Sequence, residues 1–166
     1  MEIQSEEKGF SSDIIKLITS IVVCQLAGLV GSIFTMSEIS KWYSQIAKPS
    51  FGPPSWVFGP VWVVLYLLMA VAFFFVWKKG FNDVDSIAGG IIFFGQLILS
   101  IFWSVFFFGL HSPLGGLVII IGLWAMILFT ILIFYKISKI TFWLLLPYIL
   151  WVSFAAVLNF FIWYLN

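Results

Sequence analysis

The sequence predicts an all-α fold, an integral membrane bundle of five transmembrane helices, on three observations. The 166 residues are 63% hydrophobic and only 9% charged, whereas a soluble domain has roughly 25% charged residues. Five apolar runs are each longer than the roughly 20 residues that a helix needs to cross a bilayer core. The runs are also too long, and alternate too little, for the strands of a membrane barrel.

The five spans follow one another along a single domain. They are expected at residues 14–35, 56–77, 87–110, 114–135 and 140–165, in a transmembrane domain of residues 13–166 that follows a short polar tail of residues 1–12. Asp13 and the pair Ser112-Pro113 suit helix starts, and Lys78–Gly80 suits a helix end. The first run is too long for a cleaved signal peptide, so we expect it to be retained.

The distribution of charge predicts the orientation and excludes one class of partner. Eight lysines and no arginine give a net charge of +1, which argues against a nucleic acid partner. Lysines are more frequent in the N-terminal tail and in the turns after the second and fourth spans than on the opposite side, which carries only Lys41 and Lys48. The positive-inside rule therefore predicts a cytoplasmic N-terminus and an external C-terminus.

The connection between the first two spans, residues 36–55, is the longest of the chain. It contains the aromatic pair Trp42-Tyr43 and the prolines Pro49, Pro53 and Pro54, which restrict the backbone although the segment lacks helix or strand signals. Two interpretations stay open. The loop is either a lid over the mouth of the bundle or an aromatic anchor at the depth of the lipid headgroups.

The spans lack the residues of several common chemistries. The second, third and fifth spans contain no charged residue, which disfavours proton-coupled transport. The single Cys24 excludes an internal disulfide and a cysteine-built metal site, and we expect no metal and no required cofactor. The lone His111 fits a solvated turn better than a haem ligand, and no catalytic constellation is recognisable.

Aromatic and polar side chains instead recur at helical spacing. The stripes are Phe58, Trp62, Tyr66 and Met69 in the second span; Gln96, Ser100, Trp103, Ser104 and Phe107 in the third; and Pro147, Trp151, Ala155, Leu158 and Asn159 in the fifth. Such stripes arise from helix packing alone or from an aromatic-walled pocket. In the first span the small residues Ala27, Gly28, Gly31 and Ser32 predict close helix approach, either between two copies of the chain or within one bundle.

Three motifs resemble the TspO/translocator protein family, also called the tryptophan-rich sensory or peripheral benzodiazepine receptor family. They are Trp42-Tyr43 with the run Lys48–Trp62, Leu65-Tyr66 and Met69; Gln96-Leu97 with Leu99, Trp103-Ser104 and Phe107–Leu110; and Leu146-Pro147-Tyr148 with Trp151, Phe154-Ala155 and Leu158-Asn159. The motifs occur in the family's order and cover nearly all of the chain beyond the tail.

The resemblance implies a five-helix bundle, commonly a homodimer, with a ligand cavity under the first loop. Family members bind porphyrins such as protoporphyrin IX and haem, benzodiazepine-type and isoquinoline carboxamide drugs and, in some cases, cholesterol. The lining residues that it implies are Tyr43, Pro53, Trp62, Gln96, Ser100, Ser104, Trp151, Ala155 and Leu158. The stripes add Phe58, Tyr66, Trp103 and Phe107 to these candidates.

The sequence departs from the family pattern in two ways. The third-span motif usually has Asn where this chain has Ser100, so a hydroxyl replaces an amide. No basic residue follows Lys139, so the cholesterol motif of the animal members is missing.

Three functions follow from the resemblance, in a protein that we expect in a bacterial cell membrane. The first is a receptor or stress sensor for porphyrins. The second is an enzyme-like scavenger that destroys porphyrin with light, because the tryptophans matching Trp62 and Trp151 are linked to such breakdown in bacterial relatives. The third, a tetrapyrrole transporter, is disfavoured by the lack of an inverted repeat and of a charge at the membrane midplane.

Overall fold

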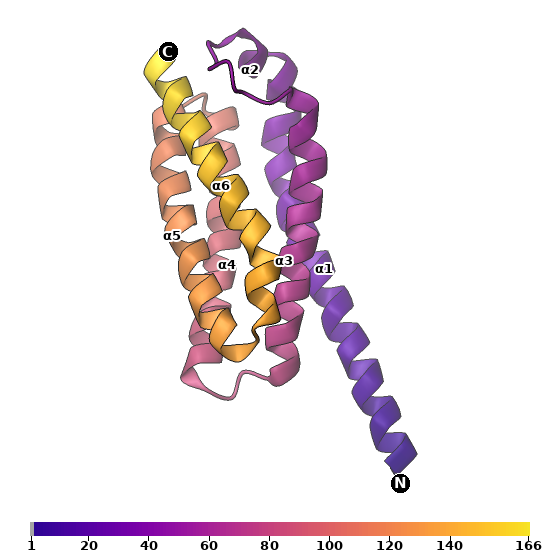
Figure 1. Ribbon diagram of the computed structural model, residues 1–166. Coiled ribbons are helices and arrows are strands. Elements are labelled where there is room, and N and C mark those ends of the chain that lie inside the picture. The colour runs from indigo at the N-terminus through magenta and orange to yellow at the C-terminus, as the bar shows by residue number, and fades with distance from the viewer. Residues whose placement is uncertain (1) are drawn as a thin grey trace.

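The computed structural model describes residues 2–166, with side chains from Phe10 onward, and five long helices account for most of them (Figure 1). The long helices are α1 (Glu2–Ser40), α3 (Phe58–Lys79), α4 (Val84–Ser104), α5 (Pro113–Ile137) and α6 (Ile140–Leu165). The short elements are α2 (Trp42–Gln45), the 3-10 turn η1 (Ser55–Val57) and the π-helical turn η2 (Val105–Gly109). The five-helix fold that the sequence predicted is confirmed: within the described part of the chain there are five helices long and apolar enough to cross a membrane.

The helix ends show where the predicted bounds hold. α6 spans the expected residues 140–165. Ser112 accepts a hydrogen bond from the Gly115 amide with Pro113 at the first position of α5, and Gly80 ends α3 with φ +93°, so these two predicted signals are confirmed. The start predicted at Asp13 is wrong, because α1 begins at Glu2, and the Asp13 carboxylate instead lies 2.6 Å from Lys78 Nζ.

The first loop is shorter than the sequence suggested. α1 continues to Ser40 and α2 covers Trp42–Gln45, so only Lys41 and residues 46–54 lack helical structure between α1 and η1. The expectation of a loop without helix over residues 36–55 is therefore wrong at its beginning. Hydropathy marks where a chain leaves the bilayer core and does not mark where a helix ends. Lys48 Nζ holds the segment by donating to the carbonyl oxygens of Tyr43 (2.6 Å) and Ile46 (3.1 Å).

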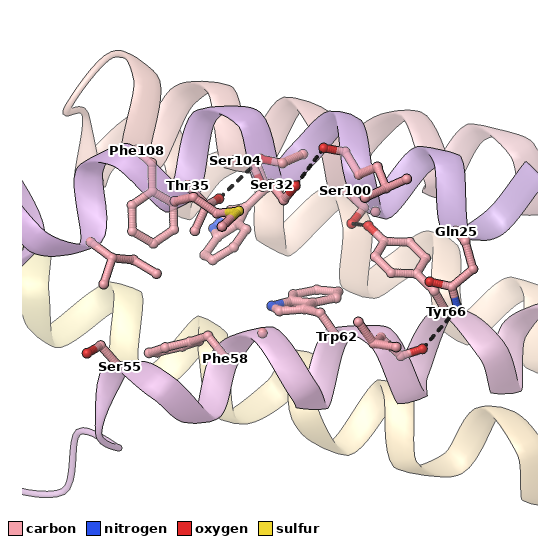
Figure 2. Close-up of a pocket in the computed structure, with 18 of the residues that line it drawn as sticks. Gln25, Ser32, Thr35, Ser55, Phe58, Trp62, Tyr66, Ser100, Ser104 and Phe108 are labelled. Carbon is pink, nitrogen blue, oxygen red and sulfur yellow. Dashed lines mark hydrogen bonds between the residues drawn. The ribbon is translucent and has the colours of Figure 1, made fainter.

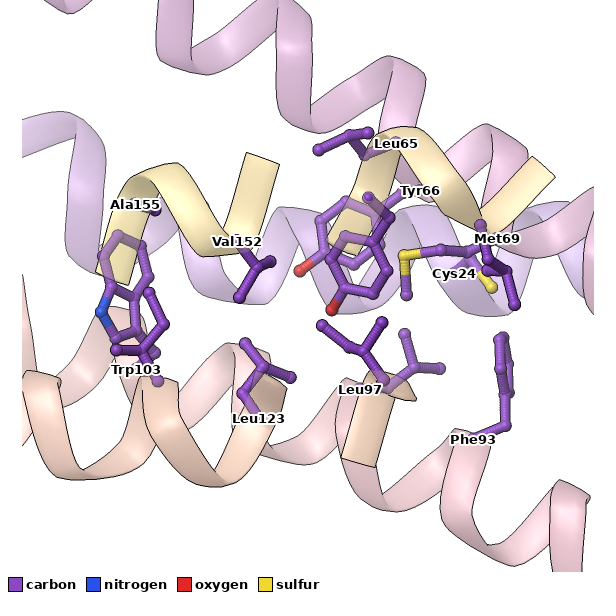
Figure 3. Packing of buried hydrophobic residues seen from close by; sticks show 14 of the residues in the cluster. Cys24, Leu65, Tyr66, Met69, Phe93, Leu97, Trp103, Leu123, Val152 and Ala155 are labelled. Atoms are coloured by element: carbon purple, nitrogen blue, oxygen red, sulfur yellow. The ribbon is translucent and has the colours of Figure 1, made fainter. Parts of the chain in front are cut away.

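The helices pack as neighbours in the pairs α4–α5, α5–α6, α1–α3, α3–α6 and α1–α4. α1 lies along the bundle on one side, and its N-terminal end projects beyond the other helices (Figure 1). α2 lies at the same end of the bundle as the C-terminus. The interior contains Cys24 from α1 and buried Met, Leu, Phe, Tyr and Trp side chains from the other long helices and the connections, some of which Figure 3 shows.

The small residues of the first span are used inside the chain. A Cβ atom on Gly28 would lie 2.7 Å from the ring of Tyr66, and one on Gly31 would lie 3.2 Å from Ser104 Oγ. Of the two interpretations of this pattern, the structure supports packing within one bundle, since α3 and α4 occupy the positions that a second copy would need.

Candidate functional site

A cavity of about 530 Å³ lies between α1, α3 and α4, in the half of the bundle nearest α2 (Figure 2). Ligand sites for drug-sized molecules commonly measure about 300–1,000 Å³. Its lining residues are Gln25, Gly28, Leu29, Gly31, Ser32, Thr35, Met36 and Ile39 from α1; Ser55 and Trp56 from η1; Phe58, Gly59, Trp62, Val63 and Tyr66 from α3; and Ser100, Trp103, Ser104 and Phe108 from α4 and η2. The cavity therefore has the size and shape of a small-molecule site.

Indole and phenol rings form the wall opposite α1. The Trp62 ring centroid lies 5.7 Å from that of Tyr66 and 6.2 Å from that of Trp103, with interplanar angles of 33° and 34°. Trp62 is one of the labelled side chains around the cavity in Figure 2. Aromatic faces of this kind suit a flat conjugated ligand, because planar π systems favour offset stacking.

The α1 wall is almost free of bulky side chains at its centre. Gly31 has only the short side chain of Ser104 within 4 Å of an added Cβ. Any larger residue at this position would extend into the space between α1 and α4. Gly31 lines the cavity, and a side chain at this position would press against Ser104.

The polar groups of the cavity are neutral. The hydroxyl groups of Tyr66 and Ser100 share a buried hydrogen bond of 2.7 Å, and Gln25 Nε2 donates to the Val63 carbonyl oxygen at 3.1 Å. The Thr35 hydroxyl donates to the carbonyl of Gly31 in its own helix. None of the described lining residues carries a charge, so the site suits a largely apolar ligand with a few hydrogen-bonding atoms.

The cavity opens sideways between α1 and α3. Four of its lining residues are largely exposed on the outside of the bundle: Leu29 (60%), Met36 (73%), Trp56 (74%) and Val63 (57%). These positions lie within or at the end of the membrane-spanning segments, where the surroundings are lipid. The opening therefore faces the bilayer, and a ligand dissolved in the bilayer could reach the cavity without crossing water.

The structure brings together only some of the candidate residues from the sequence. Phe58, Trp62, Tyr66, Ser100, Trp103 and Ser104 line the cavity. Tyr43, Phe107, Ala155 and Leu158 surround a separate, much smaller void beside Phe58 and Trp103. Gln96 is fully buried, and its amide has no hydrogen-bond partner among the described residues. Pro53 lies in the irregular segment after α2.

Trp151 lies on the other side of α3, away from α1. It borders an apolar groove between α3 and α6 that also contains Pro60 and Pro147. Its ring centroid lies 6.1 Å from that of Phe58, which does line the cavity. Trp151 thus reaches the cavity wall only through Phe58, and Trp62 and Trp151 do not face one another across the described cavity.

Hydrogen bonds fix the rotation of α6 that produces this arrangement. Trp103 Nε1 donates to Asn159 Oδ1 at 3.1 Å, and Asn159 Nδ2 donates to the Pro113 carbonyl oxygen at 2.7 Å. Both groups are polar and lie within the bundle, where an unpaired donor is costly. These bonds close the face of α6 against α4 and α5.

The sequence reasoning missed the contribution of α1. Gln25, Thr35, Met36 and Ile39 were not among the candidates, although they line the cavity. The signal in the sequence is the run of small residues in the first span, which indicates close helix packing but not a cavity wall. Small residues such as Gly31 and Ser104, which lie opposite each other on α1 and α4, can line a cavity as well as allow close packing.

His111 lies outside the cavity, in the turn between η2 and α5. Its Nε2 is 2.9 Å from Glu38 Oε2. Among the described residues, no group of three or more His, Cys, Asp or Glu side chains gathers in a way that could hold a metal ion.

Comparison with known proteins finds a family and several relatives that match most of the chain. The TspO/MBR family matches residues 20–165. A protein named tryptophan-rich protein TspO from Archaeoglobus fulgidus is 43% identical over 93% of this chain and 99% of its own length. Its namesake from Chlorobaculum tepidum is 42% identical over 94% and 99%, and the human translocator protein is 36% identical over 83% and 82%.

The similarity therefore covers both the transmembrane helices and the segment between α1 and α3. With five membrane-spanning helices in the described residues, the protein is an integral membrane protein. It belongs to the TspO/MBR family, whose members include membrane sensor and translocator proteins.

Proposed function

We propose that this protein is a membrane receptor or sensor that binds porphyrins, such as protoporphyrin IX or haem, and benzodiazepine-type drugs in the cavity between α1, α3 and α4. The observation that carries the proposal is the cavity itself: about 530 Å³ with indole and phenol walls and no charged side chain among the described lining residues. A tetrapyrrole is flat, conjugated and mainly apolar, so it matches these walls.

The ring would lie against Trp62 and Trp103, with Tyr66 and Ser100 at the inner end of the cavity. The two hydroxyl groups form a hydrogen bond to each other, so the inner end of the cavity is neutral. The opening between α1 and α3 leaves the charged edge of a porphyrin free to reach the lipid headgroups. In this arrangement no lysine is needed inside the bundle to neutralise the charged edge of the porphyrin.

The test is a titration of the purified protein with protoporphyrin IX in lipid nanodiscs, in the dark, followed by quenching of tryptophan fluorescence. We expect saturable binding with one site per chain, and competition by a benzodiazepine-type drug. Quenching that rises linearly without saturation, as for empty nanodiscs, would contradict the proposal.

Light-dependent porphyrin breakdown is the alternative function, and an experiment can distinguish it from binding alone. Trp62 is in the cavity wall with Trp103 beside it, so an oxidisable indole would touch a bound pigment. The same titration under illumination separates the two functions: a receptor keeps its pigment, whereas a scavenger bleaches it at a rate that depends on Trp62.

We further propose that the N-terminus is cytoplasmic, so that α2 and the C-terminus lie outside, following the distribution of lysines. We also expect a homodimer. Its interface would use a surface other than Gly28 and Gly31, because these residues face Tyr66 and Ser104 of the same chain.

A further inference from the structure

Three side chains from three different segments meet at the α2 end of the bundle. Glu38 comes from the end of α1, Trp42 from the start of α2, and His111 from the turn before α5. His111 Nε2 lies 2.9 Å from Glu38 Oε2. The imidazole also stacks on the Trp42 indole, with ring centroids 4.8 Å apart and an interplanar angle of 12°.

The backbone of His111 is held in an unusual conformation. Its φ is +50°, and it is the only described residue other than glycine with a positive φ. Residues with a side chain adopt this region at a cost, so the surroundings must stabilise it. The neighbouring amides are fixed: Leu110 donates to the Val105 carbonyl at 2.8 Å and Ser112 donates to the Phe106 carbonyl at 3.0 Å. The imidazole is therefore positioned by the chain rather than left to rotate freely in solvent.

The three side chains are connected to the cavity through aromatic contacts. The Trp42 ring packs edge-on against Phe107 at 5.5 Å and against Phe108 at 6.5 Å, and Phe108 lines the cavity. The next residue, Tyr43, is buried against Phe58 and Phe108. Movement of α2 would therefore disturb two residues of the cavity wall.

Charged side chains near the imidazole come from the end of α1 and the residue that follows it. Glu38 faces it from α1, and Lys41 lies close enough to Glu38 to interact with that carboxylate. α2 faces it with the neutral indole of Trp42. His111 is 45% exposed and Glu38 20% exposed at their side chains, so protons exchange readily with the medium.

Protonation of His111 would strengthen both its contact with Glu38 and its contact with Trp42. A neutral imidazole donates one hydrogen bond to Glu38, whereas the imidazolium forms an ion pair with it. The imidazolium also places a positive charge over the indole face, which is the arrangement of a cation–π contact. Histidine side chains ordinarily change charge between about pH 5 and 8, and His111 is the single histidine of the sequence.

We propose that Glu38, Trp42 and His111 form a pH-sensitive latch, which holds α2 over the end of the cavity more firmly when His111 is protonated. The stabilisation is present at acidic pH and is lost as the pH rises and the imidazole loses its proton. The latch is a property of the protein without ligand, and it goes beyond the proposed binding of porphyrins. Acidification on the α2 side of the membrane would then hold Phe58 and Phe108 of the cavity wall more firmly in place.

The test is amide hydrogen exchange of residues 41–54, measured by mass spectrometry on the ligand-free protein in nanodiscs at pH 5.5 and 7.5. After correction for the intrinsic pH dependence of exchange, we expect about two- to fivefold greater protection at pH 5.5, the size typical of a partly exposed ion pair. His111→Gln and Glu38→Gln should each remove this difference.

A matched control is Asp85→Asn, which breaks the exposed pair between Asp85 and Lys136 in the turns at the other end of the bundle and should leave the difference unchanged. Equal corrected protection at the two pH values in the unmodified protein would overturn the latch, whether or not the variants fold. A pH difference that persists in His111→Gln would overturn it as well. Because no ligand is present, neither result bears on porphyrin binding.

Discussion

Aromatic side chains are packed differently in the two halves of the bundle. In the half away from α2, the rings of Phe73, Phe93 and Phe134 stack in series, with centroids 4.7 Å and 5.7 Å apart and interplanar angles of 12° and 21°. In the half nearest α2, Trp62, Tyr66 and Trp103 lie beside a cavity of about 530 Å³. One half is closed and the other is hollow, although both are built from aromatic side chains.

The difference depends on what faces each glycine. A Cβ atom on Gly89 would lie 3.0 Å from the ring of Phe134, so a large ring fills the space beside that glycine. Gly31 faces only the short side chain of Ser104, whose Oγ would lie 3.2 Å from an added Cβ, and both residues line the cavity. A glycine thus allows close packing or leaves a void according to the size of its partner on the next helix.

The largest expected effect is in the closed half. Phe93 is completely buried and stacks on both Phe73 and Phe134. Phe93→Ala should lower the free energy of unfolding by about 3–5 kcal/mol, the usual cost of removing a buried phenyl ring. Equilibrium unfolding in mixed detergent, followed by circular dichroism, measures this loss.

The same variant separates the two halves. The affinity for protoporphyrin IX should remain within about twofold in protein that is still folded, since Phe93 does not line the cavity and distant sites act almost independently. A loss of affinity clearly larger than about twofold in folded protein would show that the closed half also shapes the site.

A second change would fill the hollow half. Gly31→Leu should place a side chain between α1 and α4 and weaken porphyrin binding at least about tenfold, while overpacking lowers stability by no more than about 1–3 kcal/mol. Gly122→Leu is the matched control, because an added Cβ there meets only Leu99 at 3.8 Å. Equal affinities for these two variants would mean that the ligand does not use the space beside Gly31.

A smaller effect is expected at the inner end of the cavity. Ser100→Ala leaves the buried hydroxyl of Tyr66 without its partner, which should cost about 1–3 kcal/mol of stability. Adding Tyr66→Phe should recover part of this loss, because both polar groups are then removed. A double-mutant cycle by the same unfolding assay gives the coupling, and additive losses would show that the hydrogen bond contributes nothing.

The sequence predicted the helices better than their ends. The apolar run of α6 begins directly after Lys139 and continues almost to Asn166, so its bounds follow from composition. α1 extends beyond its apolar run at both ends, because Glu, Lys and Ser are compatible with a helix outside the bilayer core. Composition locates the membrane, whereas hydrogen bonding determines where a helix stops.

The candidate site was harder to predict than the fold. The stripes of α3 and α4 turn inward, as their spacing indicated, and Tyr66 and Ser100 form a buried hydrogen bond there. The rotation of α6 is set by Asn159, which accepts from Trp103 and donates to Pro113. Such long-range bonds have no signature in the local sequence, so the position of Trp151 relative to the cavity could not be predicted from helical periodicity.

The central claim is that the ligand lies between α1, α3 and α4, against Trp62. The most direct test compares protoporphyrin IX binding by Trp62→Phe and Trp151→Phe, titrated in the dark in nanodiscs. Trp62→Phe should weaken binding by roughly 0.5–1.5 kcal/mol, the scale of an aromatic stacking contact, and Trp151→Phe should leave the dissociation constant nearly unchanged. Weakening by Trp151→Phe alone would contradict the account and place the ligand between α3 and α6.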